Sequence, residues 1–201
     1  MVHHAVLRDL PGAKEAAEHY RSNPNADYHA IVAGMTDLDR DLAKAVNFAK
    51  IYGAGPKKFA EMIGKPLSEA RAIIAQYDSR LPFVARLSRI CQDEAVERGY
   101  TVLYDGARRH WDRYEAAYVY AKGAGPCSYE EAVRRRLDPE HPWFYQTLQR
   151  HGTYTALNAQ IQGDSARHTK LWMRACARDG IVPLLQMHNA LECSVKTREQ
   201  G

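Results

Sequence analysis

Residues 40–53 read Arg-Asp-Leu-Ala-Lys-Ala-Val-Asn-Phe-Ala-Lys-Ile-Tyr-Gly, and one side chain in every four stands out. Arg40, Lys44, Phe48 and Tyr52 recur at four-residue spacing, directly before Gly53. On an α-helix a four-residue step advances by only about 40° beyond a full turn, so these four side chains form one slowly winding stripe. The segment therefore predicts a helix that ends near Gly53 and shows this stripe on one face.

The order of side chains along the stripe indicates a ligand. Two cations come first and two aromatic rings follow, which suits a nucleoside triphosphate, with its polyphosphate and flat base. The same spacing also fits two solvated cations and two rings in a core. Like charges four residues apart repel by about 0.2–0.5 kcal/mol, so the cations are mildly unfavourable without an anion. The opposite face is expected to be buried and carries Leu42, Ala45, Val46 and Ala49.

Composition restricts the class of protein. The 201 residues suffice for one large domain or two small ones, and 45% hydrophobic with 26% charged residues is typical of a globular chain. The net charge of +4 is compatible with a polyanionic partner. No apolar run approaches the roughly 18 residues of a membrane span, so we expect a cytoplasmic protein without a membrane partner. The scattered cysteines predict reduced thiols, without a zinc site or disulfide framework: Cys91, Cys127, Cys176 and Cys193.

Prolines, glycines and helix-capping residues divide the rest of the chain into predicted helices and strands. Short helices are expected over residues 1–35, and Thr36 or Asp37 is expected to cap the helix that carries the stripe. Further helices are expected over 67–80, from Pro82 to about 98, near 129–137, and over 152–178. Strands are expected over 100–104, 182–188 and 191–195, the last two as an antiparallel hairpin. The predicted fold class is α+β, predominantly helical.

The pattern Arg-x3-Lys-x3-Phe-x3-Tyr-Gly at residues 40–53 resembles the fingers helix of family A DNA polymerases, the bacterial DNA polymerase I type and its phage relatives. Four other segments resemble that family in the same order. They are Asp27-Tyr28-His29, the turn at 104–109, Asn158-Ala-Gln-Ile-Gln162-Gly163, and Gln186-Met-His-Asn-Ala-Leu191, where active members read His-Asp-Glu. The resemblance covers about residues 27–110 and 152–195.

The resemblance implies a nucleotide site on the stripe. His29, Arg40 and Lys44 would contact the triphosphate of the incoming nucleotide. Phe48 and Tyr52 would pack near the sugar and base of the nascent pair. For His29 an ordinary surface histidine is the competing interpretation.

The resemblance also implies contacts with DNA. Asn158 and Gln162 would hydrogen-bond minor-groove acceptors, which every base pair presents, so the contact would be independent of sequence. An ordinary polar helix face is the alternative for this pair. The remaining residues expected at the DNA are Gly53, Arg108 and Arg109. Gly53 would allow a close turn, and the two arginines would be phosphate contacts or ordinary surface residues.

The catalytic part departs from the family. Family members transfer nucleotides with two Mg²⁺ ions held by two palm aspartates. Nothing resembling the first aspartate's Asp-x-Ser-x-x-Glu strand precedes Asp27, and the second aspartate's position is Asn189, beside His188. Position 154, often Arg in the family, is Tyr. We therefore expect Mg²⁺ for the intact family but not for this chain, and no activity of the chain alone.

The predicted organisation follows the same resemblance. We expect a fingers subdomain with flanking palm-side helices over 1–110, an irregular insertion over 111–151 and a partial palm over 152–201. The expected function is that of a fragment of a DNA-directed DNA polymerase in replication or repair, with DNA primer–template and deoxynucleoside triphosphates as partners. The alternatives are a non-catalytic DNA- or nucleotide-binding module and a helical scaffold. A hairpin without a partner strand would favour self-association.

Overall fold

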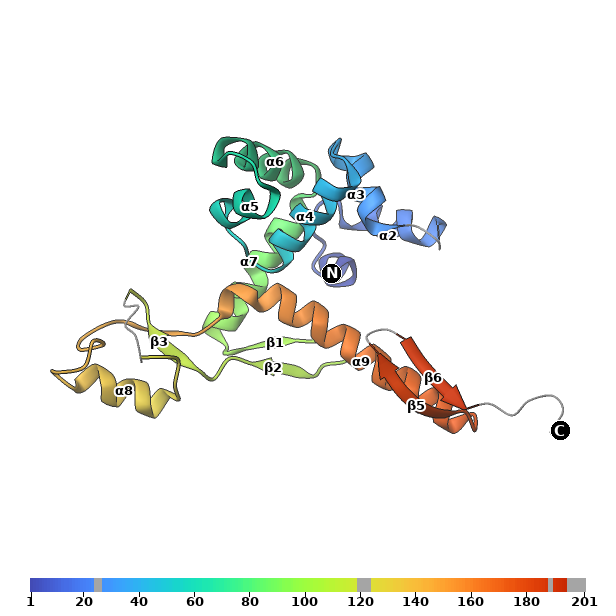
Figure 1. Ribbon diagram of the computed structural model, residues 1–201. Coiled ribbons are helices and arrows are strands. Elements are labelled where there is room, and N and C mark those ends of the chain that lie inside the picture. Colours follow the sequence, from blue (N-terminus) through green and yellow to red (C-terminus); the bar gives the residue numbers. More distant parts are fainter. Residues whose placement is uncertain (24–26, 119–123, 188–189, 195–201) are drawn as a thin grey trace.

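The computed structural model describes residues 1–23, 27–118, 124–187 and 190–194. Helices dominate this part of the chain, and three antiparallel strand pairs join them, which confirms the predicted α+β class (Figure 1). The helices are α1 (Val2–Leu7), α2 (Ala13–Ser22), α3 (Tyr28–Thr36), α4 (Arg40–Ile51), α5 (Pro56–Ile63), α6 (Leu67–Arg80), α7 (Pro82–Glu97), α8 (Tyr129–Leu137), the 3₁₀-helix η1 (Thr153–Thr155) and α9 (Ala156–Arg178). The strands are β1 (Tyr100–Val102), β2 (Arg108–His110), β3 (Tyr114–Ala116), β4 (Leu148–Arg150), β5 (Val182–Met187) and β6 (Ala190–Ser194).

The helix that carries the stripe is α4, and its predicted cap is wrong. Asp39 caps it, because its Oδ1 accepts hydrogen bonds from the backbone N–H groups of Asp41 (3.0 Å) and Leu42 (2.9 Å). Thr36 instead ends α3, and Asp37 terminates that helix with a left-handed φ of 56°. Only residues 37–39 connect α3 to α4, and the N-cap of α4 is Asp39, the residue directly before Arg40.

The end of α4 is confirmed where the sequence predicts it. Gly53 has a φ of 70°, which glycine adopts without strain. The N–H of Ala54 donates to the carbonyl of Ala49 at 2.8 Å, and the N–H of Gly53 donates to that of Lys50 at 3.3 Å. This pair of bonds is a Schellman motif, which satisfies carbonyls that the helix end leaves open.

The buried face of α4 differs from the predicted one. Leu42 and Ala45 are only half-buried. The helix packs against α3, α5, α6 and α7, so a broader face is covered than a single apolar stripe. The residues that are buried are Ala43, Val46, Asn47 and Ala49.

The three helices that follow α4 are predicted only in part by local sequence signals. The predicted bounds of α6 are confirmed, and α7 starts at Pro82 as expected, with proline in the first turn of the helix. The short helix α5 is missing from the predicted elements, because a proline after two glycines favours a helix stop, whereas Pro56 stands at the first position of α5, where proline is tolerated. Gly64 ends α5 with a φ of 65°.

The main core lies where α7 passes between the helical cluster and α9. Helix α7 contacts α1, α4 and α6 on one side, and β1, η1 and α9 on the other. Figure 1 shows α9 running beneath the cluster formed by α2 to α6. Among the described helices, including the 23-residue α9, none has the length and apolarity of a membrane span. The largest buried core side chains include Phe59, Tyr77, Phe83, Leu87 and Leu157.

A separate small core lies inside the stretch expected to be an irregular insertion. The predicted helix is confirmed as α8, but the paired strands β3 and β4 were not expected. Figure 1 shows this segment extending from one end of the molecule, away from the helical cluster. Its buried residues are Ala116, Cys127, Ala132 and Trp143.

The predicted C-terminal hairpin is confirmed as β5 and β6. Their antiparallel register pairs Pro183 with Cys193 and Gln186 with Leu191. The sequence predicts a turn at His188-Asn189-Ala190; positions 188 and 189 lie outside the described residues, and Ala190 is instead the first residue of β6.

Gly53, at the end of α4, packs against η1, directly before α9. A Cβ atom at this position would lie 2.6 Å from the backbone carbonyl oxygen of Tyr154 in η1. Real side-chain carbons do not approach an oxygen so closely, so the absence of a side chain permits the contact. The end of the stripe is thereby held against the segment that begins α9.

We expect Gly53→Ala to destabilise the protein more than Gly64→Ala, by urea denaturation. Both glycines have a positive φ, which costs an alanine about 1 kcal/mol. A Cβ at Gly64 meets no atom within 4 Å, whereas a Cβ at Gly53 collides with the Tyr154 carbonyl. The expected losses are about 1 kcal/mol at Gly64 and about 3 kcal/mol at Gly53. Equal losses would show that the contact with Tyr154 does not constrain the fold.

Candidate nucleic-acid interface

The stripe lies on the exposed side of α4. Phe48 and Tyr52 are 40% and 48% exposed, and their ring centroids lie 6.2 Å apart at an interplanar angle of 41°. The alternative that places both rings in the core is therefore wrong. Lys44 is exposed and forms no ion pair with any residue in the part of the chain that the structure describes.

Arg40, at the other end of the stripe, is held by a carboxylate. The Oδ2 atom of Asp27 accepts from Nη2 of Arg40 at 2.6 Å and from its Nε at 3.0 Å. The hydrogen bond from Arg40 is the main reason why the pKa of Asp27 is held below its usual value. The other carboxylate oxygen caps α3 by accepting from the N–H groups of His29 and Ala30. Asp27 thus couples the start of α3 to the cationic end of the stripe.

His29 lies beside the stripe with a defined tautomer. Its Nδ1 is 3.3 Å from the side-chain nitrogen of Asn47, and its ring centroid is 5.7 Å from that of Phe48. An amide nitrogen donates, so Nδ1 accepts and the proton of the neutral ring sits on Nε2. Burial lowers the pKa of His29, and the charges of Arg40 and Lys44 lower it further against the opposing effect of Asp27. The lowered pKa favours the neutral imidazole at pH 7.

Asn47 orients His29 and was missed by the sequence reasoning. It is 1% exposed, and its Oδ1 accepts from the hydroxyl of Tyr77 in α6 at 2.6 Å. The amide thus joins α3, α4 and α6 through His29, Asn47 and Tyr77. The periodic pattern does not reveal it, because at about 100° per residue Asn47 lies outside the face expected to be buried and next to the stripe. A buried amide needs such partners.

We expect Asn47→Ala and Tyr77→Phe to be coupled in a double-mutant cycle measured by urea denaturation. Asn47→Ala alone is expected to cost about 1–3 kcal/mol, because it removes a buried acceptor for the Tyr77 hydroxyl. The coupling energy should be about 0.5–3 kcal/mol, since both changes remove one shared hydrogen bond. Ser79→Ala, at an exposed serine bonded within α6, serves as control and should add to Asn47→Ala without coupling. Additive losses for Asn47 and Tyr77 would contradict the network.

We expect Lys44→Ala to raise the pKa of His29, measured from its ring signals in an NMR titration. The positive charge of Lys44 disfavours the imidazolium form, so its removal stabilises that form and moves the pKa upward. Lys58→Ala removes an exposed lysine that pairs with Glu61 in α5 and should leave the pKa of His29 unchanged. A pKa that falls, or does not move, in Lys44→Ala would place Lys44 away from the imidazole.

The strand pair β1 and β2 carries the two predicted arginines. Arg108 and Arg109 point to opposite sides of β2, since neighbouring residues of a strand alternate. The guanidinium carbon of Arg108 lies 4.4 Å from the ring centroid of Tyr100, and that of Arg109 lies 5.5 Å from the ring of Trp111. Both side chains are exposed, and stacking on a ring holds each in place while its N–H groups remain accessible.

Helix α9 carries the predicted pair Asn158 and Gln162. The two residues are four apart and so lie along one side of the helix. Gln162 is exposed, whereas Asn158 is half-buried. The Oδ1 of Asn158 is buried and accepts no hydrogen bond from the described residues. The amide of Gln162 is therefore accessible to solvent, whereas the buried amide oxygen of Asn158 has no partner among the described residues.

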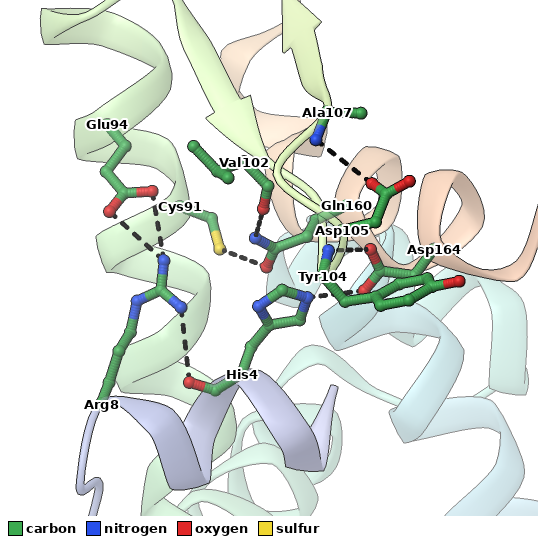
Figure 2. Close-up of polar contacts among 10 residues, drawn as sticks. All are labelled: His4, Arg8, Cys91, Glu94, Val102, Tyr104, Asp105, Ala107, Gln160 and Asp164. Atoms are coloured by element: carbon green, nitrogen blue, oxygen red, sulfur yellow. Dashed lines mark hydrogen bonds and ion pairs between the residues drawn. The ribbon is translucent and has the colours of Figure 1, made fainter. Parts of the chain in front are cut away.

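The opposite side of α9 is anchored by buried polar contacts (Figure 2). Gln160 is fully buried, donates to the carbonyl of Val102 at 2.7 Å and accepts from the thiol of Cys91 at 3.2 Å. Asp164 accepts from the backbone N–H of Tyr104 at 2.9 Å and lies 2.6 Å from Nε2 of His4. These contacts fix the turn between β1 and β2, α7 and α1 against α9.

The structure brings some of the predicted residues together. Gly53 contacts Tyr154, which lies one helical turn before Asn158, so the aromatic end of the stripe meets the start of α9. Tyr154 and Arg109 line the same cavity of about 260 Å³, next to Trp111. Arg108 faces the other side of the strand. The predicted catalytic positions His188 and Asn189 lie outside the described residues, so their placement relative to the stripe stays a prediction.

Comparison with known proteins adds an independent line of support. The model of the family described as DNA polymerase family A matches residues 23–200. A DNA-directed DNA polymerase of Pseudomonas phage M6 is 26% identical over 241 aligned residues, which cover all of this chain and 32% of that protein. A DNA polymerase of Mycobacterium phage L5 is 33% identical over 103 residues, covering 51% of this chain and 17% of that protein. The chain thus spans about a third or less of these relatives' length.

A solved structure shares the fold. It is described as the POL domain of Pol1 from M. smegmatis in complex with DNA primer-template and dNTP. The similarity has a TM-score of 0.61 and covers 89% of this chain and 29% of that one, at 24% sequence identity. At this identity the likeness shows the fold alone.

Proposed function

The chain belongs to DNA polymerase family A, and we propose that it supplies the part of a template-directed DNA polymerase that holds the incoming deoxynucleoside triphosphate and the primer–template. The observation that carries the proposal is the exposed stripe on α4 beside the oriented His29. Cations, a neutral imidazole donor and two open rings lie in the order in which a nucleotide presents phosphates, sugar and base.

The triphosphate would bind at the N-terminal part of the stripe. Lys44 has no ion-pair partner in the described part of the chain and would make the first contact. Arg40 would have to exchange the carboxylate of Asp27 for phosphate oxygens, which offer more charge and suit the two donors that Arg40 now directs at Asp27. The Nε2–H of His29 would add a neutral donor. Phe48 and Tyr52 would then lie next to the sugar and base.

The primer–template would lie along α9 and the hairpin of β1 and β2. The amides of Asn158 and Gln162 suit minor-groove acceptors that all base pairs share. Arg108 and Arg109, held on aromatic rings, suit phosphate contacts. Gly53, in contact with the Tyr154 carbonyl, would hold Tyr52 in place beside the primer–template.

We propose that this chain alone binds no catalytic Mg²⁺ and extends no primer. The described residues include no group of three or more His, Cys, Asp or Glu side chains that could hold a metal ion, and position 189 is an uncharged asparagine in the sequence. These residues do not fit a two-metal site, so we derive no chemical step through Mg²⁺. A non-catalytic DNA- or nucleotide-binding module is the second candidate function, and the asparagine at 189 favours it.

Self-association through the C-terminal hairpin also stays a proposal. Leu184 is 67% exposed in β5, and the sheet of β5 and β6 has only two strands within the described residues. Such strands offer unpaired backbone groups and apolar surface to a second chain. Sedimentation velocity at increasing protein concentration tests this, and a constant monomer would contradict it.

We expect Lys44→Ala to weaken binding of a fluorescent deoxynucleoside triphosphate about tenfold, since a charge-assisted hydrogen bond contributes about 1.4 kcal/mol. Asp27→Ser should tighten binding, because serine can still cap α3 while Arg40 is released. Lys58→Ala, at an exposed lysine of α5, is the matched control and should change little. Equal effects of Lys44→Ala and Lys58→Ala would show that the stripe is an ordinary solvated face.

Primer extension separates the two candidate functions. We expect no extension by the purified chain with either Mg²⁺ or Mn²⁺, and none from Asn189→Asp alone. Salt-dependent binding of labelled primer–template without extension would support the binding module. Extension by the unmodified chain would show that the proposed inactivity is wrong.

A further inference from the structure

Tyr154 presents an exposed ring between the end of the stripe and the start of α9. Its side chain is 57% exposed and lies in η1, one helical turn before Asn158. A Cβ atom at Gly53 would lie 3.3 Å from Cδ2 of the Tyr154 ring, so this ring stands directly beside the end of α4. Tyr52, which precedes Gly53 in the chain, is 48% exposed. Two exposed tyrosines therefore lie next to the same glycine.

The backbone that carries this ring is held in place by several contacts. Thr155 donates its N–H and its hydroxyl to the carbonyl of Gly152, at 2.9 Å and 2.8 Å. The carbonyl of Tyr154 touches Gly53, and η1 packs against both α7 and α9. A tyrosine side chain has few rotatable bonds, so a ring on such a backbone loses little conformational freedom when it binds a partner.

The cavity beside the ring suits a nucleobase better than a bare anion. Tyr154 and Trp111 line this cavity of about 260 Å³ together with Arg109 and Arg113. Asp112 lines it too, so a carboxylate offsets part of the positive charge of the arginines. Arg109 is exposed and stacks on the ring of Trp111. An exposed ring next to an accessible cation matches a nucleotide unit, whose base stacks while its phosphate pairs with the cation.

We propose that Tyr154 stacks on an unpaired base of a single-stranded template. The inference rests on the proposed function, which puts duplex DNA along α9 and the incoming base at Phe48 and Tyr52. Bases inside a duplex are covered on both faces by neighbouring pairs, so a tyrosine ring can stack only on a base that has left the duplex. Such stacking tolerates every sequence, because every base has a π face.

The position of the ring agrees with this partner. Tyr154, Asn158 and Gln162 follow one another at four-residue spacing, and the two amides are the proposed contacts to the duplex. Tyr154 continues their line past Asn158 to the aromatic end of the stripe, where the nascent pair would lie. The next base that a ring at this point meets is the first template base without a partner.

Equilibrium binding of a labelled primer–template to the full chain tests the proposal. The first unpaired template base is either kept or replaced by an abasic site, which retains the phosphates and removes only the ring. We expect Tyr154→Ala to weaken binding of the intact DNA about tenfold, within the range of one base–aromatic stack. The abasic site should weaken binding to the unmodified chain by a similar factor, and the two losses should not add.

Matched variants and DNA separate stacking from other effects. Tyr154→Phe keeps the ring and should bind like the unmodified chain. Tyr118→Ala removes a tyrosine that is 83% exposed between β3 and α8, and it should change nothing. Blunt-ended duplex, which has no unpaired base, should bind equally well to the unmodified chain and to Tyr154→Ala. The abasic comparison uses the unmodified chain, so it remains decisive even where Tyr154→Ala fails to fold.

The salt dependence of binding gives a second readout. Tyr154→Ala should leave the slope of log affinity against log salt unchanged, because a tyrosine ring neutralises no phosphate. Tyr154→Arg should steepen that slope by about 0.7. Additive losses, a changed slope in Tyr154→Ala, or binding that ignores both Tyr154→Ala and the abasic site would overturn this inference while the proposed function stands. No binding of primer–template by the unmodified chain at low salt would overturn both.

Discussion

The buried amide of Gln160 is the contact on which the arrangement of the molecule depends. A side-chain amide without water costs free energy unless both of its ends are satisfied, and here each end has one partner, Val102 and Cys91. Those partners belong to β1 and α7, so α9 can satisfy the amide only at one register against both elements. Gly163 tightens the same register, since a Cβ there would lie 2.7 Å from the Leu103 side chain. The positions of Arg108 and Arg109 relative to Asn158 and Gln162 follow from this one constraint.

In the helical cluster a second buried amide, that of Asn47, orients His29. Asn47 fills a buried position of α4 and takes its two partners from α3 and α6, which fixes one nitrogen of His29 as an acceptor. The imidazole then stays neutral next to two cations, because burial and those charges both disfavour its protonation. This surface presents three donors that differ in charge and pairing: the Arg40 guanidinium, which is paired with Asp27, the neutral His29 ring, and the exposed Lys44 ammonium group.

Local chemistry explains which parts of the fold the sequence could predict. The bounds of α6, α7 and α8 follow from prolines, glycines and a serine cap that act within one turn, and these predictions are confirmed. The stripe was predicted because its period is helical. The predicted cap of α4 is wrong because α3 extends to Thr36, and the predicted buried face is too narrow because α3, α5, α6 and α7 all contact α4. The pairing of β3 with β4 and the bond of Asn47 with Tyr77 depend on partners about 30 or more residues away, which no local pattern reveals.

The base of the segment between Trp111 and Arg150 is closed by its own two ends. Trp111 donates its N–H to the carbonyl of Gly99, and the Arg150 guanidinium donates to the carbonyls of Trp111 and Val96. That guanidinium fills the space where a Cβ of Gly99 would stand. The chain therefore leaves and rejoins the main body at a single point, with its own small core beyond that point. Evolution can lengthen, shorten or exchange such a side branch without moving α7 or α9, which makes it the natural place for related proteins to diverge in size.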